Sequence, residues 1–208
     1  MIRKFVFIFT VFLVALGILA TTVFRSASVR YAFNGETQDG GSDNQKASID
    51  YSFPYQGGIL PDHPAWPIKV LRDKFWYLLT ASSAKKAELL LLFADKRLLA
   101  AKILFEKDKA EIAYSTLTKA EKYLEEVVTL NEENTRRGVD TVGFSSRLAK
   151  AALRHRQVIE SEILPIAPED AKPAIVKLLD YSKNAYNKVS DLLKSKGVNP
   201  PENPFETE

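Results

Sequence analysis

The stretch SAKKAELLLLFADKRLLAAKILFE, residues Ser83–Glu106, decides the predicted fold. Its small and apolar residues recur in alternating steps of four and three, a spacing that places them on one side of an α-helix. The residues of this side are Ala87, Leu91, Ala94, Leu98, Ala101 and Phe105. Between Leu89 and Phe93 every residue is apolar, which indicates a central helix that other helices surround.

The same periodicity continues on both sides of this stretch. It predicts further helices over Pro67–Leu79, Lys109–Asn134, Ser145–Leu164 and Lys172–Ser195. In the shortest of these, the residues on one side are Ile68, Leu71, Phe75, Leu78 and Leu79. No strand-like alternation of useful length appears. Long helices with short connections favour a bundle, so we expect an all-α fold, an antiparallel helical bundle of four long helices plus one shorter helix.

An uninterrupted apolar stretch precedes the predicted bundle. Phe5–Phe24, FVFIFTVFLVALGILATTVF, contains no charge, and about 20 such residues span the ~30 Å hydrocarbon core of a bilayer. The apolar part of a cleaved signal peptide is shorter, about 7–15 residues. We therefore expect a single N-terminal transmembrane helix, with residues 1–30 as the membrane anchor and the lipid bilayer as the partner of Phe5–Phe24. A signal peptide that is cut to release a secreted protein is the alternative.

Composition divides the rest of the chain into three parts. Residues 31–50 are rich in Gly, Ser, Asp and Asn, which predicts a flexible tether. Residues 51–197 form the predicted bundle domain, and the Pro-rich residues 198–208 are expected to be a disordered tail. An N-terminal anchor followed by one large domain normally exports that domain. We therefore expect a single-pass protein of the cytoplasmic membrane with its C-terminal domain outside the cytoplasm.

The bundle domain opens with a strap of prolines and aromatic residues, YSFPYQGGILPDHPAWP, over residues 51–67. Because proline fixes φ and lacks a backbone donor, this segment is expected to be extended or turning chain. In the simplest interpretation the strap closes one end of the bundle; in the other, it forms half of a groove that receives a partner. Tyr and Trp often dominate interfaces, so Tyr55, Trp66, Trp76 and Tyr77 are the candidate partner-binding residues.

Charge and cysteine content exclude several classes of protein. The net charge is +3, but the first thirty residues hold four bases and no acid, which leaves 25 bases against 26 acids in the remainder. A nucleic-acid binder concentrates positive charge on its folded domain, so no nucleic-acid partner is expected. The absence of cysteine from the sequence excludes disulfides, thiol nucleophiles and cysteine-ligated metals.

No catalytic, cofactor-binding or metal-binding residue is predicted, and the chain is expected not to be an enzyme. His155 has only alanine, valine and isoleucine three and four positions away, so its own helix offers no second metal ligand. We expect a buried or partly buried histidine with satisfied hydrogen bonds. Ser82-x-x-Lys85 matches a motif of penicillin-recognising enzymes, but its companion motifs are missing or out of order. Ser82 is therefore expected to be a helix N-cap.

A series of short motifs resembles one known family. The series comprises Phe53-Pro54-Tyr55, Gly58-Ile59-Leu60-Pro61-Asp62-His63-Pro64, Pro67-Ile68-Lys69, Arg72-Asp73-Lys74, Lys85-Lys86-Ala87-Glu88-Leu89 and Ala94-Asp95-Lys96-Arg97-Leu98. It is similar to an uncharacterised bacterial family, domain of unknown function 5667, over roughly Tyr51–Glu125. The resemblance implies an N-terminal signal or anchor and a helical extracytoplasmic domain, and it brings no established activity.

Anchor, tether, near-neutral body and lack of a catalytic motif together favour one function. We expect a membrane-tethered extracytoplasmic helical module with a structural or protein-interaction role in a bacterial envelope, where its partner would be an envelope protein. One alternative is a small-ligand or peptide-binding domain of tetratricopeptide type, although its 34-residue repeat does not recur. The other is an envelope hydrolase, which would require Ser83, Lys86, His63 or His155 to converge with carboxylates in one cleft.

Overall fold

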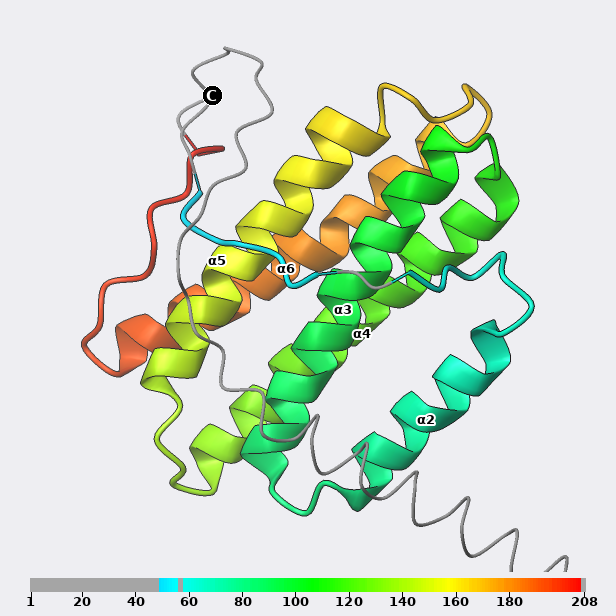
Figure 1. The fold of residues 1–208 in the computed structure, drawn as a ribbon. Coiled ribbons are helices and arrows are strands. Elements are labelled where there is room, and N and C mark those ends of the chain that lie inside the picture. The colour runs from blue at the N-terminus through cyan, green and yellow to red at the C-terminus, as the bar shows by residue number, and fades with distance from the viewer. Residues whose placement is uncertain (1–48, 56–57, 207–208) are drawn as a thin grey trace, which may run out of the picture. The chain divides into compact units, whose positions relative to one another are not determined.

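The computed structural model describes residues 49–55 and 58–206. These ranges hold five α-helices and a short π-helical segment, and they contain no strand. The elements are α2 (Trp66–Leu79), α3 (Ser83–Glu106), α4 (Ala110–Arg136), α5 (Val142–Val158), η1 (Ile159–Ile163) and α6 (Lys172–Ser195). The predicted all-α fold is confirmed for this part of the chain (Figure 1).

The predicted membrane anchor, residues 1–30, and nearly all of the predicted tether, residues 31–50, lie outside the described residues. Within the described ranges, no helix combines the length and the apolar character needed to cross a bilayer. The transmembrane helix therefore stays a prediction from the sequence.

Helices α3 to α6 form the bundle. α3 packs along α4, α5 packs along α6, and α4 also packs along α6. Residues 107–109 make a short turn between α3 and α4, which form a helical hairpin. Alanines from the predicted apolar sides are completely buried, among them Ala94, Ala101, Ala113 and Ala120. Because a methyl group takes little space, the helix axes approach closely at these positions.

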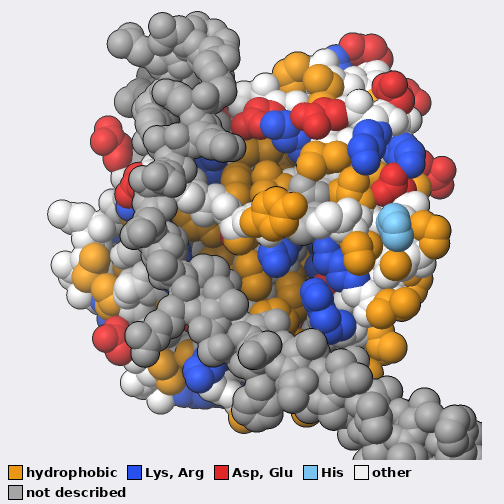
Figure 2. All heavy atoms as spheres, in the orientation of Figure 1, with side chains coloured by type: hydrophobic (Ala, Val, Ile, Leu, Met, Phe, Trp, Pro, Cys, Tyr) orange, Lys and Arg blue, Asp and Glu red, His pale blue; other side chains and the backbone are white. Residues whose placement is uncertain are grey.

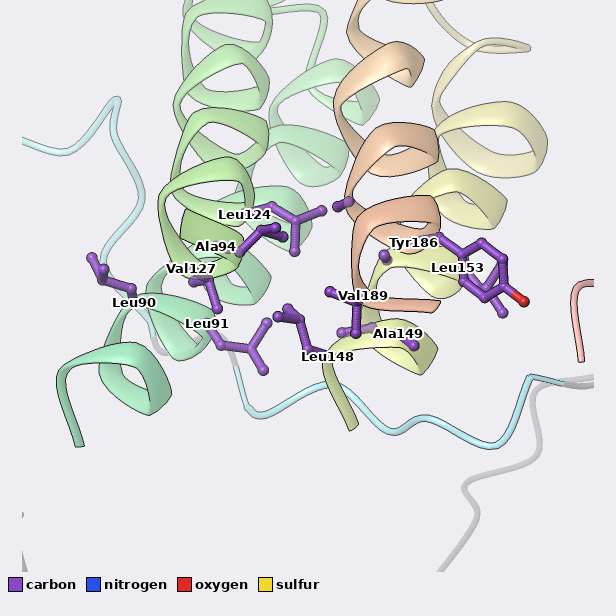
Figure 3. Close-up of a cluster of buried hydrophobic side chains, with 14 of the residues drawn as sticks. Leu90, Leu91, Ala94, Leu124, Val127, Leu148, Ala149, Leu153, Tyr186 and Val189 are labelled. Carbon is purple, nitrogen blue, oxygen red and sulfur yellow. The ribbon is translucent and has the colours of Figure 1, made fainter. Parts of the chain in front are cut away.

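Two clusters of buried apolar side chains fill the bundle. One cluster draws on the first half of α3, the second halves of α4 and α6, and the middle of α5. The other cluster draws on the second half of α3, the first halves of α4 and α6, the last residue of α5 and η1. The four helices therefore alternate in direction, as the prediction of an antiparallel bundle requires. Figure 3 shows the first cluster, in which Leu91, Leu124, Leu148 and Val189 come from α3, α4, α5 and α6.

Both ends of the described chain run over the bundle (Figure 1). At the C-terminal end, residues 198–206 were expected to belong to a disordered tail, but in the structure they pack on the helices. The Tyr186 hydroxyl donates to the carbonyl oxygen of Pro201 at 2.7 Å, and the Arg156 guanidinium lies 4.0 Å from the ring centroid of Phe205. Val198 and Phe205 supply apolar surface for this packing, which the polar and Pro-rich composition of the tail concealed.

Candidate functional site

Helix α2 lies beside the bundle, and it makes no extensive backbone contact with another described helix. Five of its large apolar side chains are directed to solvent rather than into the core. We call this surface the apolar face of α2; it consists of Ile68, Leu71, Phe75, Leu78 and Leu79, with exposed fractions of 72%, 56%, 46%, 71% and 71%. The predicted grouping of these residues on one side of the helix is confirmed, and that side faces away from the bundle.

The opposite side of α2 holds the helix on the bundle through aromatic and ionic contacts. The ring of Trp76 lies edge-on to Phe93 of α3, with 6.4 Å between centroids. The Tyr77 ring lies 5.3 Å from the Lys86 ammonium, and its hydroxyl donates to Glu126 at 3.5 Å. Asp73 is buried. These bulky contacts occupy the space between α2 and the bundle, so the aliphatic side chains of α2 are left outside.

A group of cations lies between α2 and α3. We call Lys69, Arg72, Lys96 and Arg97 the α2–α3 cations. Arg72 binds Asp73 at 2.7 Å. Arg97 is 7% exposed and its guanidinium stacks 4.5 Å from the ring centroid of Tyr123, with Trp66 and Phe93 each 5.9 Å away. Figure 2 shows Lys and Arg side chains gathered in this region, next to hydrophobic side chains at the outer edge of the molecule.

Burial is the main influence on the pKa values of these cations, and neighbouring charges act in both directions. Burial lowers the pKa of Lys69, and repulsion from Lys96, Arg72 and Arg97 adds to this effect, while attraction to Asp73 opposes it. Burial also lowers the pKa of Lys96, again against the attraction of Asp73. Asp73 thus acts as a shared counter-ion for several neighbouring cations.

The four candidate partner-binding residues are placed differently. Tyr55 is 85% exposed. Trp66, Trp76 and Tyr77 are half-buried, and they contact Arg97, Phe93 and Lys86 respectively. Their role in binding stays a prediction. The spacing of the five apolar residues is visible in the sequence, but it did not identify the apolar face of α2 as a binding surface. An amphipathic pattern does not show which side of a helix meets the bundle.

A second feature is the buried cluster of Asp95, Glu121 and His155, which come from α3, α4 and α5. His155 is completely buried. Its Nδ1 lies 2.8 Å from Glu121 Oε1, and its Nε2 lies 3.0 Å from Asp95 Oδ1. The predicted buried histidine with satisfied hydrogen bonds is confirmed, but its partners come from other helices and were not foreseen.

The strap covers this buried cluster. The Tyr51 hydroxyl donates to Asp95 Oδ2 at 2.6 Å, and the Phe53 ring lies 5.8 Å from the His155 ring. Burial opposes the positive charge of His155, but attraction to Glu121 and the hydrogen bonds that the ring donates to both carboxylates raise its pKa from 6.5 to about 9. An imidazolium that donates both N–H groups follows from this arrangement.

The geometry of the buried cluster differs from that of a metal site. The two carboxylates bind opposite nitrogens of one ring, so they do not converge on a single ion, and no group of three His, Asp or Glu in the described ranges is placed to hold a metal. Three of the residues whose convergence would favour a hydrolase have separate partners. His63 Nδ1 accepts from Ala65 N–H, Lys86 lies over Tyr77, and His155 lies between Glu121 and Asp95. Ser82, next to Ser83, accepts from Lys85 N–H as the predicted N-cap.

A shallow cavity of about 260 Å³ lies between α4 and α6. Its lining residues are Glu125, Val128, Asp180, Tyr181, Asn184, Ala185 and Lys188. Ligand sites for drug-sized molecules usually measure roughly 300–1,000 Å³ and enclose most of the ligand. The cavity is thus small for the ligand-binding alternative, and it is separate from both the buried cluster and α2.

Together, fold and surface define an all-α bundle protein that carries an additional amphipathic helix on its side. The sequence of residues 58–169 matches the family described as Domain of unknown function (DUF5667), and because this match covers more than half of the chain, the protein belongs to that family. The match extends from before α2 to beyond η1, so it includes the apolar face of α2 and all three residues of the buried cluster. No curated protein and no solved structure matches the chain.

Proposed function

We propose that this protein is a membrane-tethered helical module, located outside the cytoplasm in a bacterial envelope, whose role is structural or one of interaction rather than catalysis. The observation that carries the proposal is the apolar face of α2, five large side chains exposed side by side. Contiguous exposed apolar surface marks sites of association with proteins or membranes. The apolar stretch Phe5–Phe24 supports the tether.

The buried cluster supports a role without catalysis. A catalytic acid or base must reach the proton that it transfers, and His155 is completely enclosed. Its two nitrogens are already engaged by Glu121 and Asp95. The cluster is therefore suited to fixing three helices relative to one another.

The tether is tested by labelling a single cysteine, since the natural chain has none. In the Lys177→Cys variant the new thiol lies on the exposed surface of α6. In intact cells we expect a membrane-impermeant maleimide to label this thiol, and we expect the chain to stay in the membrane pellet after alkaline carbonate extraction. Labelling that occurs only after cell lysis, or release of the chain by carbonate, would refute the proposal.

The interaction role is tested with a photocrosslinking amino acid in the native envelope. We expect adducts when it replaces Leu71 on the apolar face of α2, and none when it replaces the exposed Lys177 of α6. Equal adduct yields at the two positions, or none at Leu71, would show that α2 does not carry the interaction.

A further inference from the structure

The apolar face of α2 has charged edges of one sign. At 100° per residue, its five side chains occupy an arc of about 100° around the helix axis. Arg72 falls just beyond one edge of this arc and Lys74 beyond the other, and both are exposed. Asp73, the acidic residue of α2, lies on the side that meets the bundle and is buried. The exposed part of α2 is therefore an apolar stripe with a cation on each side.

The α2–α3 cations extend this charge on the Arg72 side. Lys69 follows Arg72 around the helix and interacts electrostatically with Arg72, Lys96 and Arg97. Its ammonium lies 4.8 Å from the ring centroid of Trp66 and donates to the carbonyl oxygen of Ile59 at 3.0 Å. A surface that fits α2 must therefore be apolar in its centre and negative along its edges.

A second copy of this chain does not meet that requirement. Two α2 helices placed face to face would bring Arg72 and Lys74 of both copies together without an acidic residue on either exposed face. Like charges brought together in this way oppose association. An anionic bilayer, in contrast, offers negative headgroups at its surface and apolar chains below them.

We propose that α2 lies in the plane of an anionic bilayer surface, with its apolar face at the boundary of headgroups and acyl chains. Arg72 and Lys74 then contact lipid phosphates on the two sides of the helix. This inference rests on the proposed function, because the tether is what keeps α2 beside a bilayer. The partner that the inference assigns to the apolar face of α2 is a lipid bilayer.

The test measures how deeply α2 enters the bilayer. The full chain is reconstituted into vesicles of phosphatidylcholine, with or without phosphatidylglycerol, and carries one environment-sensitive fluorophore on Ile68→Cys, Leu78→Cys or, as control, Lys177→Cys. Ile68 and Leu78 lie near opposite ends of α2. In the anionic vesicles we expect lipid-borne quenchers to quench both α2 labels to the same extent, and to leave the control label unquenched.

Charge variants test the role of the two edge cations. The matched pair is Arg72→Gln/Lys74→Gln and Lys122→Gln/Lys177→Gln, since all four side chains are exposed and each variant loses two positive charges. With the Leu78→Cys label, we expect the first variant to lower the equilibrium constant for docking on anionic vesicles by roughly thirtyfold. The second should behave like the natural chain. Far-UV circular dichroism checks that both remain folded.

Three results would overturn the inference. The α2 labels could be as accessible to water as the control label, they could be quenched equally in neutral vesicles, or they could be shielded by contact between copies in detergent without lipid. The carbonate extraction described above keeps the two proposals apart. A chain that leaves the membrane refutes the tether, whereas an anchored chain with accessible α2 labels refutes only the docking of α2.

Discussion

At the scale of single residues, the most consequential arrangement is His155 between two buried carboxylates. Removing one partner from a buried ion pair costs about 3–5 kcal/mol, because it leaves a charge without compensation. Glu121 and Asp95 precede His155 by 34 and 60 positions in the sequence. Their meeting depends on the rotation and register of three helices, and helical periodicity does not specify these to within a hydrogen-bond length.

The raised pKa of His155 predicts how stability depends on pH. Its folded value is about 9, above the ordinary 6.5, so the stabilisation is fully present below pH 6.5 and is lost as pH rises to about 9. At about 1.4 kcal/mol per pH unit, the loss is on the order of 3 kcal/mol. Denaturant titrations of the full chain in a non-ionic detergent should show this decline. A His155→Gln variant should be less stable at pH 6 and should lose the dependence; a natural chain with equal stability at pH 6.5 and 9 would contradict the assignment.

The hydroxyl of Tyr51 predicts a smaller effect. Its hydrogen bond to Asp95 Oδ2 is 2.6 Å long, and bonds of this kind to charged groups contribute about 1.5–3 kcal/mol. Tyr51→Phe should therefore lower the free energy of unfolding by about 1–2 kcal/mol, since the site is only partly buried. Tyr55→Phe is the control, because Tyr55 is largely exposed, and it should have little effect. If both variants lost the same free energy of unfolding, the hydrogen bond to Asp95 would not be the cause of the loss.

At the scale of elements, the helices could be predicted well and their orientation only in part. The bounds of α3 and α6 agree residue for residue with the apolar periodicity, because Ser82 caps α3 and Pro173 stands in the first turn of α6. The apolar periodicity of α2 equally predicted a helix, but not its outward rotation. That rotation results from the contacts of Trp76 and Tyr77 with the bundle and from the attraction of Asp73 to cations of α3, which involve residues distant in the sequence.

The outward rotation of α2 predicts an unusual pattern of mutational effects. Leu71→Ser and Leu78→Ser should each change the free energy of unfolding by less than about 0.5 kcal/mol, because both leucines are exposed. Leu98→Ala should cost about 2–5 kcal/mol, because Leu98 is completely buried in α3. Chemical denaturation in detergent measures all three. A large loss from Leu71→Ser would mean that the apolar face is packed on the protein.

At the scale of the whole molecule, the structure combines a well-packed bundle with a loosely attached helix. Local stability follows from packing, and elements with few buried apolar contacts open most readily. In nanodiscs of neutral lipid, backbone amides of α2 should exchange hydrogen faster than those in the middle of α3 and α6. Mass spectrometry of the exchanging full chain would show this difference. Protection of α2 equal to that of α3 would contradict the loose attachment.

The strap also determines how the folded domain would respond to a pull. Asp50 pairs with Lys150 of α5 at 2.9 Å, and the next residue, Tyr51, is bonded to Asp95. Tension applied along the chain at Ile49 would therefore load these two bonds one after the other, before any helix carries the force. A domain stretched from its N-terminal side would open at the strap first, and the first internal group to lose its cover would be His155.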